Sequence, residues 1–275
     1  MSSYSPKVSL IISVYDNVKY LKFVLDSLKF QTFKQFEVIV SEDAEHLHMR
    51  EFISNYQASF PIFHLTQPDE GWKKNVALNR SAIFAHTDYL IFIDGDCALH
   101  PRFIEFHIKL SDPDFIVAGK RIKLDSPSTQ WLMENEGNIL HFQSYLIRNY
   151  LCMRKNGALF MEEGFFFNPQ KPLGIIPRLR TMRYLKGCNM SFYKDALLAI
   201  NGFDEDYIMP AVGEDADLAW RFRLAGYQLK SARNLAVQYH LHHKESWTKQ
   251  DVNLAMMKEK QAANQYVCKN GIKKL

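Results

Sequence analysis

The stretch Tyr89-Leu90-Ile91-Phe92-Ile93-Asp94-Gly95-Asp96 joins five apolar residues to two carboxylates. An apolar run without alternation is typical of a strand buried on both faces, as in a parallel sheet covered by helices. Carboxylates fit at the carboxyl end of such a strand, where ligands bind in open α/β sheets. Asp94 and Asp96 would point to the same side, and Gly95 would let a ligand approach the backbone. The pair therefore suggests a divalent-cation site, with a plain Asp-Gly turn as the alternative.

Strand and helix patterns alternate on both sides of this stretch. Strands are expected at residues 8–14, 36–40, 62–65 and 115–118, and helices at residues 20–28, 49–56, 71–84 and 101–110. This order predicts a doubly wound α/β domain, in which helices flank a central sheet.

Polar residues follow three of the expected strands. They are Tyr15-Asp16, Glu42-Asp43 and Asp94-Gly95-Asp96. Because the carboxyl ends of parallel strands meet at one edge of a sheet, we expect these residues to line one crevice.

The composition sets broad limits. The chain has 275 residues, 47% of them hydrophobic and 23% charged, with a net charge of +4. This charge is too small to suggest nucleic acid as a partner, although it is compatible with an anionic substrate or an acidic membrane surface. Four cysteines without a Cys-x-x-Cys pair fit a reducing cytoplasm. We find no signal peptide and no apolar run of about 20 residues, so we expect a soluble protein, cytoplasmic or peripheral to the inner membrane face.

The second half of the chain is less regular. One helix is expected at residues 131–151, and residues 164–174 form an irregular segment rich in aromatics, proline and glycine. A long irregular loop is often functional, so this segment suggests an insertion on the acceptor side, with a plain loop as the alternative. The chain end reads as helical, and its basic cluster, residues 269–274, is expected to be a frayed tail.

Several polar clusters carry candidate chemistry. Glu214-Asp215 precedes an expected helix, so it is either a helix cap or a general base aimed at a pocket. The cluster His240, His242 and His243 follows an expected strand and could bind a metal or lie at the surface. Trp72 and Tyr15 could stack on a base or belong to the core. Lys73, Lys74, Asn75 and Asn79 could contact phosphate or sugar, or form a solvated helix face.

Taken in chain order, these segments resemble a family 2 glycosyltransferase with the GT-A fold. The resemblance runs from about residue 8 to about residue 243. Asp94-Gly95-Asp96 matches the family's DxD motif, and Gly213-Glu214-Asp215 matches the motif that carries the general base. Residues 187–192 and 201–205 resemble blocks of the branch related to galactosyltransferases.

Three positions depart from the family pattern, and at one of them Ala44-Glu45 replaces the Gly-Ser that often follows the paired acids. Ser13 stands where a proline is common, and Glu42-Asp43 stands where a pair of aspartates is usual. The resemblance still implies one GT-A (Rossmann-like) domain over residues 1–245, with a mixed, mostly parallel sheet. Within it, residues 1–100 would form the nucleotide-binding half and residues 101–245 the acceptor-binding half, with an insertion near 124–183. Residues 246–275 would form a helical tail.

The resemblance also implies residue roles. Asp43 would bind uracil beside Tyr15 and Asp16. The rest of the nucleotide-sugar site would comprise Ser13, Trp72, Asn79, Asp94, Gly95 and Asp96. Asp96 would also bind Mn²⁺ or Mg²⁺ with a histidine, His240 in preference to His242. Asp215 would deprotonate the acceptor hydroxyl while Glu214 orients acceptor or donor, and Asn189 and Gly213 would lie on the acceptor side.

The implied activity is inverting transfer of a hexose or N-acetylhexosamine from a UDP-sugar to a glycan or lipid-linked glycan. The product would be a bacterial surface polysaccharide or lipopolysaccharide. One alternative is a sugar-phosphate nucleotidyltransferase, although residues 13–17 lack the Gly-rich loop of that class. The other is a non-catalytic module that binds nucleotide sugars, and the Glu214-Asp215 pair speaks against it.

Overall fold

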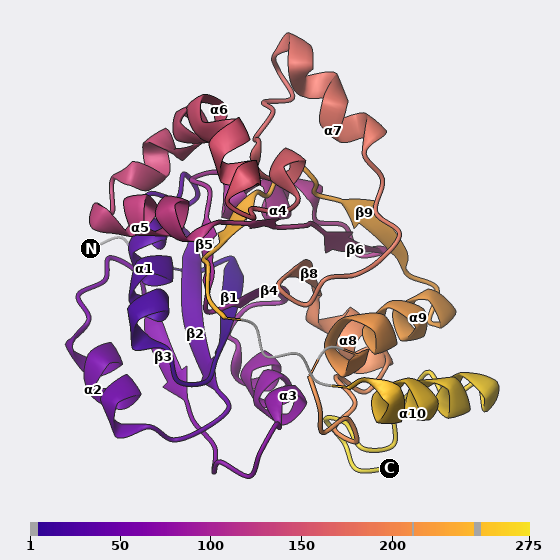
Figure 1. The fold of residues 1–275 in the computed structure, drawn as a ribbon. Helices are drawn as coiled ribbons and strands as arrows, with labels where there is room; N and C mark the ends of the chain where they lie inside the picture. Colours follow the sequence, from indigo (N-terminus) through magenta and orange to yellow (C-terminus); the bar gives the residue numbers. More distant parts are fainter. Residues whose placement is uncertain (1–4, 211, 245–248) are drawn as a thin grey trace.

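The computed structural model describes residues 5–210, 212–244 and 249–275. Within these residues, one sheet of seven strands has the order β3-β2-β1-β4-β8-β6-β9 (Figure 1). Its strands are β1 (Val8–Val14), β2 (Phe36–Glu42), β3 (Ile62–Leu65), β4 (Tyr89–Asp94), β6 (Phe115–Ala118), β8 (Asn189–Tyr193) and β9 (Gln228–Ser231). Strand β8 runs antiparallel to β4 and β6, and the other pairs in this sheet are parallel. The expected mixed, mostly parallel sheet is confirmed.

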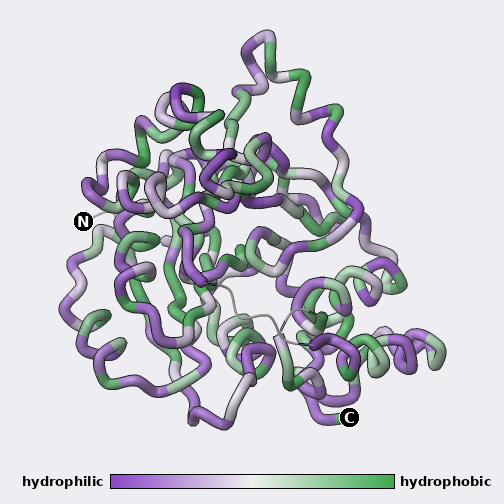
Figure 2. The backbone as a smooth tube through the Cα atoms, viewed as in Figure 1, coloured by the Kyte–Doolittle hydropathy of each residue, from purple (hydrophilic) through white to green (hydrophobic). Residues whose placement is uncertain are grey.

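Helices cover both faces of the sheet. The helices of the described residues, of which α1 and α3 pack on opposite faces, are α1 (Val18–Leu28), α2 (Leu47–Asn55), α3 (Lys74–Phe84), α4 (Phe103–Leu110), α5 (Ser126–Glu134), α6 (Asn138–Lys155), α7 (Ile175–Leu179), α8 (Lys194–Ala199), α9 (Asp217–Leu224) and α10 (Asp251–Ala262). Alternate residues of β4 enter different cores: Ile91 and Ile93 pack in the core that contains α1, and Leu90 and Phe92 in the core that contains α3. This division explains why β4 is apolar without alternation, and the hydropathy colouring shows such strands inside the molecule (Figure 2).

A small second sheet lies beside the end of β4. Its order is β5-β10-β7, formed by β5 (Cys97–Leu99), β10 (Gln238–His240) and β7 (Ile122–Lys123). Strands β5 and β10 are antiparallel and pair Cys97 with His240, while the amide of Leu241 donates to the carbonyl of Asp96. The C-terminal histidines are thereby brought to Asp96. Strands as short as β5 and β7 contain too few residues to show an alternation of apolar and polar side chains, so the sequence pattern does not predict them.

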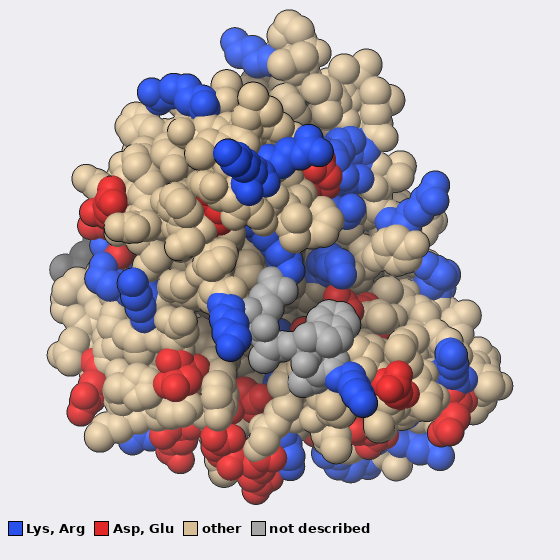
Figure 3. Space-filling view, viewed as in Figure 1, with Lys and Arg blue, Asp and Glu red and all other residues tan. Residues whose placement is uncertain are grey.

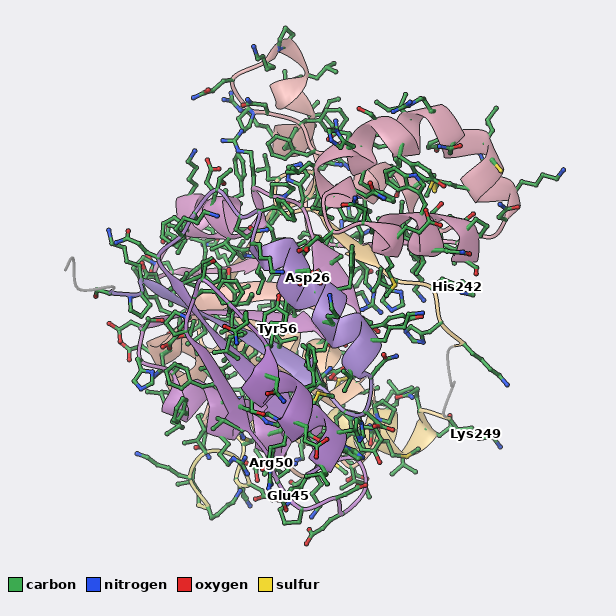
Figure 4. All side chains as sticks on the ribbon, turned by 90° about the vertical axis from the view of Figure 1, so that its left-hand side faces the viewer. Asp26, Glu45, Arg50, Tyr56, His242 and Lys249 are labelled. Atoms are coloured by element: carbon green, nitrogen blue, oxygen red, sulfur yellow. The ribbon has the colours of Figure 1, made fainter. Side chains whose placement is uncertain are left out.

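The region between β7 and β8 differs from the single helix expected at residues 131–151. Two helices, α5 and α6, are separated by Asn135-Glu136-Gly137, where the amide of Asn138 donates to the carbonyl of Asn135. Short 3₁₀ turns follow at Met161–Gly164 and Pro172–Gly174, before α7. Figures 1 and 4 place α6 and α7 at the same end of the molecule.

The C-terminal segment is only partly helical. After α10, residues 263–275 pack against the turn that begins at Asn201, whose amide nitrogen donates to the carbonyls of Cys268 and Lys273. Cys268 is fully buried there. The expectation of a frayed tail at residues 269–274 is therefore wrong, because non-local hydrogen bonds hold this segment in place.

Among the helices of the described residues, none is both long and apolar enough to cross a membrane.

Candidate functional site

A cleft of about 780 Å³ opens at the carboxyl ends of β1, β2 and β4. Its lining comes from all three polar strand ends and from the N-terminal end of α3. The lining residues are Ser13, Val14, Tyr15, Asp16, Asn17, Tyr20, Asp43, Gly71, Trp72, Lys74, Asp94, Gly95, Asp96, His243 and Lys244. The expected convergence of the three strand ends on one crevice is therefore observed.

Asp96 lies against two histidines at this cleft. Its Oδ2 is 3.3 Å from Nε2 of His240 and 3.0 Å from Nε2 of His243. Burial alone would raise the pKa of Asp96, but the hydrogen bonds to both histidines outweigh burial and hold this pKa well below its usual range. Asp96 is thus an ionised carboxylate at neutral pH.

His242 does not join this cluster. Strand β10 ends at His240, so the alternation that would place His242 beside His240 no longer applies. The side chain of His242 is exposed near α1 and α5 (Figure 4), while its carbonyl accepts a hydrogen bond from the hydroxyl of Tyr20. The structure therefore favours His243 over the predicted His242 as the partner of His240.

The three groups fit a divalent cation. Within the described residues, one carboxylate oxygen and two imidazole nitrogens of Asp96, His240 and His243 lie within 4.8 Å of one another. A mixed set of oxygen and imidazole donors suits Mn²⁺ or a similar first-row ion. Asp94 and Cys97 lie close to Asp96 as well, but Asp94 is occupied by two cations of the protein.

Asp94 belongs to a chain of alternating charges. Its Oδ2 is 3.0 Å from the guanidinium of Arg121, and its Oδ1 is 2.9 Å from the ammonium of Lys74. The same ammonium lies 2.6 Å from the carboxylate of Glu214. Burial would raise the pKa of Asp94, but Lys74 and Arg121 lower it. One lysine thus connects the DxD segment to the Glu-Asp motif.

Glu214 and Asp215 lie on the π-helical turn Val212–Ala216, directly before α9. Asp215 lies 3.5 Å from the ammonium of Lys186 and accepts a hydrogen bond from the amide of Ala216. Burial raises the pKa of both carboxyl groups above the usual values. Their positions differ in one respect, because Glu214 is held by a mostly buried lysine and Asp215 by an exposed one.

At the end of the cleft formed by β1 and β2, several side chains are held in place by other groups of the protein. The carboxylate of Asp43 accepts hydrogen bonds from the side chain of Gln67 and the amide of Lys73. Asp16 contacts His48, and the hydroxyl of Tyr15 donates to Asp69. Glu42 points away from the cleft, where His46 and His64 contact its buried carboxylate.

Three of the predicted contact residues are buried inside the fold. Asn79 is buried and exchanges hydrogen bonds with the backbone of Phe203. Asn189 is buried and binds His107 and the carbonyls of Lys120 and Ala236. Gly213 packs against Tyr207, where a side chain would clash. The side-chain amides of Asn79 and Asn189 are thus already satisfied inside the fold, and the placement of the three residues in donor or acceptor contacts stays a prediction.

Gly95 lines the cleft and also packs closely against β1. A Cβ atom at this position would lie 2.5 Å from Cγ1 of Val14, and the Gly95 amide donates to the carbonyl of Ser13. The missing side chain allows close approach of β1, which fixes the two flanking aspartates against the sheet.

Sequence reasoning missed Arg121 and ranked His243 last. Arg121 follows Gly119-Lys120 after β6, and a basic residue at a strand end is a signal that could have been noted. Nothing local distinguishes His243 from His242, because the path of the irregular segment after β10 decides which ring faces Asp96.

Comparison with known proteins identifies the family. Residues 9–173 match the sequence profile of "Glycosyl transferase family 2". The chain belongs to glycosyltransferase family 2. Residues 178–244 also match a profile described as "N-terminal domain of galactosyltransferase". Both the family and the branch expected from the sequence are thereby confirmed.

Curated relatives of this family member are longer proteins. It is 24% identical over 241 residues to a chondroitin synthase of Escherichia coli. The matched region covers 85% of this chain and 34% of that relative. It is 24% identical over 229 residues to a hyaluronan synthase of Pasteurella multocida, with coverage of 80% and 23%. The chain thus spans about a third and about a quarter of these two relatives.

Solved structures show the same fold. The mannosyltransferase PcManGT from Pyrobaculum calidifontis, in complex with GDP-Man and Mn²⁺, has a TM-score of 0.56 at 16% identity, covering 96% of this chain and 64% of that one. TarS of S. aureus has a TM-score of 0.54 at 16% identity, covering 86% and 37%. The chain therefore has the expected GT-A fold.

Proposed function

We propose that this family 2 member is a metal-dependent, inverting glycosyltransferase. It transfers a hexose or N-acetylhexosamine from a UDP-sugar to a hydroxyl of a glycan or lipid-linked glycan. The observation that carries this proposal is the cluster of Asp96, His240 and His243 beside Asp43, with Glu214 and Asp215 connected to the same cleft through Lys74. Synthesis of a bacterial surface polysaccharide or lipopolysaccharide is the proposed setting, with a cytoplasmic or peripheral inner-membrane location.

The relatives support the donor and product classes. Their names include synthases of chondroitin and hyaluronan, which are polysaccharides. TarS has been solved with UDP and with UDP-GlcNAc, at 15% and 18% identity. The neighbour solved with GDP-Man and Mn²⁺ supports a divalent ion, and it makes a GDP-sugar the main competing donor.

The nucleotide end of the cleft suits a base and a ribose. Asp43 can accept a hydrogen bond from the uracil ring, and Tyr15 and Trp72 offer rings at the mouth of the cleft. Asp43 is held in place by Gln67 and the amide of Lys73, so it is preorganised before the donor binds. Ser13, Asp16, Asp94 and Gly95 complete the proposed donor site.

The diphosphate belongs beside Asp96. Asp96, His240 and His243 would hold Mn²⁺ or Mg²⁺, and such an ion neutralises a diphosphate and makes the nucleotide a better leaving group. The ammonium of Lys74, which also lines the cleft, lies between Asp94 and Glu214. These side chains orient the donor and stabilise the charge that develops on it.

The acceptor side assigns different roles to the two acids. Glu214 is held by Lys74, so its carboxylate orients the sugar or the acceptor without taking a proton. The ammonium nearest to Asp215 belongs to the exposed Lys186 at 3.5 Å, a looser contact than that of Glu214 with Lys74, so Asp215 is free to accept the proton of the attacking hydroxyl. One base and one displacement give inversion at the anomeric carbon.

Replacement of the proposed base tests this function. We expect Asp215→Asn to lower kcat of UDP-sugar transfer by about 10²–10⁴-fold, the contribution of a general base, with little change in donor binding. The measurements are UDP release with candidate acceptors and titration of the UDP-sugar. Asp195→Asn, an exposed acid at the start of α8, is the control.

The pH profile gives a second readout of the same variant. Because burial raises the pKa of Asp215, the acid limb of kcat/KM should lie above the ordinary aspartate value of 3.8. A raised carboxyl pKa adds stability at low pH that is lost as pH rises through the folded-state value. Asp215→Asn should therefore be at least as stable as the wild type at pH 7, with the difference shrinking on acidification. Wild-type transfer rates in this variant would refute the assignment.

A further inference from the structure

The apolar side chains left exposed on this protein are concentrated in one segment. Among the described residues, nineteen large apolar side chains are exposed, and nine of them lie between residues 138 and 186. This segment contains α6, two 3₁₀ turns and α7, and it forms one end of the molecule (Figures 1 and 4). Isolated exposed apolar residues are ordinary, but a concentration of this kind marks an interaction surface.

Helix α6 has two separate apolar stripes. Ile139, Phe142, Leu146 and Met153 are buried against the core. Leu140, Ile147 and Leu151 are spaced by seven and four residues, so they share another side of the helix, roughly a third of a turn away. Ile147 is 61% exposed and Leu151 is 79% exposed. The second stripe is therefore left without a partner inside the described structure.

Basic residues flank this second stripe. Arg148 and Lys155 project on one side of it and Arg154 on the other, at helical spacing. All three side chains are exposed, and no carboxylate of the described residues forms an ion pair with them. An apolar stripe bordered by Lys and Arg is the pattern of a helix that lies in a membrane interface.

The segment that follows α6 repeats this composition. Leu173, Ile175 and Leu179 are exposed on and before α7, and Leu179 is 74% exposed. Lys171 and Arg178 are exposed between them. The hydropathy colouring shows apolar residues along this projecting part, and Lys and Arg are more frequent than acids on the same end of the surface (Figures 2 and 3).

The charge of this end differs from the rest of the chain. Residues 138–186 contain eight Lys and Arg against two Glu, a net charge of +6. The whole chain has a net charge of +4, so the remaining residues together carry −2. One of the two glutamates, Glu163, is buried and paired with Arg180 and Arg233. The exposed end is thus complementary to an anionic surface.

We infer that the α6–α7 segment, residues 138–186, docks the protein on an anionic lipid bilayer. Leu140, Ile147 and Leu151 enter the interface, and Arg148, Arg154 and Lys155 contact the headgroups. This inference stands on the exposed side chains and their charge, and it holds whichever donor the cleft accepts. A bilayer contact on this end would give the protein access to an acceptor carried on a lipid.

Vesicle co-sedimentation tests the docking surface. The probes are vesicles of phosphatidylcholine alone and of phosphatidylcholine mixed with anionic phosphatidylglycerol. We expect the wild type to bind the anionic vesicles, to bind neutral ones at least tenfold more weakly, and to lose affinity as salt is raised. Replacement of the three basic residues by Gln should weaken anionic binding by about 100-fold, or about fivefold per charge.

The apolar stripe is tested by a second triple variant. Leu140→Ser, Ile147→Ser and Leu151→Ser together should reduce binding to anionic vesicles at least tenfold. The matched control is the triple variant Leu47→Ser, Ile83→Ser and Leu198→Ser, whose side chains are exposed on α2, α3 and α8. This control should bind the vesicles like the wild type. The charge control replaces Arg223, Lys258 and Lys269 by Gln. Because all these side chains are exposed, circular dichroism should show native folding in every variant.

Three outcomes would overturn the inference. The first is a wild-type protein that binds neither vesicle. The second is binding that the control variants weaken as much as the α6 variants do. The third is a self-associated wild type in sedimentation velocity that becomes monomeric with the apolar triple variant, without vesicle binding. That result would make the surface a contact between copies of this chain.

Discussion

At the scale of single residues, Lys74 holds the two halves of the candidate site together. Its ammonium lies 2.9 Å from Asp94, on β4, and 2.6 Å from Glu214, on the π-helical turn before α9. The lysine is 16% exposed and its pKa is raised, because the two carboxylates outweigh the effect of burial. This buried ammonium lowers the pKa of both carboxyl groups against the effect of burial, although the pKa of Glu214 remains raised, and it fixes the separation of the two acids.

Removal of this ammonium should destabilise the fold. We expect Lys74→Met to lower the free energy of unfolding by about 3–5 kcal/mol, the usual cost of leaving a buried charge without its partner. Urea denaturation at pH 7 measures the change. Among the described residues, the ammonium of the neighbouring Lys73 forms an ion pair with the exposed Glu70, so Lys73→Met should leave the midpoint unchanged.

A double variant identifies the cause. Lys74→Met combined with Glu214→Gln should recover part of the lost stability, because the unpaired carboxylate is then neutral. An unchanged midpoint in Lys74→Met, or no recovery in the double variant, would contradict the proposed charge bridge.

At the scale of elements, the C-terminal segment supports the turn that leads to the Glu-Asp motif. Asn201 and Gly202 adopt left-handed conformations, with φ of +60° and +83°. Asn201 is held by the backbone of Cys268 and Lys273, while Asp204 and Asp206 bind Lys260 on α10. Asn79 on α3 contacts the same turn from the other side.

Gly271 is the closest point of this contact. A Cβ atom there would clash with the carbonyl of Asn201 and lie 2.6 Å from Sγ of Cys268. We expect Gly271→Ala to lower the free energy of unfolding by about 1–3 kcal/mol through overpacking, as urea denaturation would measure. The control Lys269→Ala changes an exposed side chain in the same segment and should have no effect. Equal urea midpoints for Gly271→Ala and Lys269→Ala would contradict this prediction, because they would show that the C-terminal segment can shift to accommodate the added methyl group.

At the scale of the whole molecule, the cleft joins distant parts of the chain. Its lining extends from Ser13 to Lys244, and its metal-binding candidates are Asp96, after β4, His240, at the end of β10, and His243, beyond β10. A ligand that binds only this assembled cleft stabilises the entire fold against unfolding. Thermal unfolding therefore reports on the site without an identified acceptor.

We expect a UDP-sugar with Mn²⁺ to raise the Tm of the wild type. At a concentration of 100 times Kd, the ligand adds about 2.7 kcal/mol. His243→Gln should lose most of the Mn²⁺-dependent part, because His243 contacts Asp96, whereas His242→Gln should retain it. A thermal-shift series with UDP-, GDP- and CMP-sugars, with and without Mn²⁺, measures both effects. Absence of metal-dependent stabilisation by every UDP-sugar, or equal losses in the two histidine variants, would contradict the site.

The sequence by itself determined the features that local patterns encode. The mostly apolar sequence of β1 and the unbroken apolar run of β4 predict strands buried on both faces, because two cores receive their alternate side chains. The polar residues after β1, β2 and β4 predict the cleft, because parallel strands end at one edge. The same argument places Asp94 and Asp96 in this cleft, because both lie at the carboxyl end of β4.

Only the tertiary structure decided which polar side chains are available. Asn79 and Asn189 are indistinguishable from ligand contacts in the sequence, yet both are satisfied by backbone groups far along the chain. His243 reaches Asp96 because β10 pairs with β5 and then ends, whereas His242 lies at the surface. The physical reason is that spacing fixes neighbours within an element, while non-local pairing fixes which groups meet across elements.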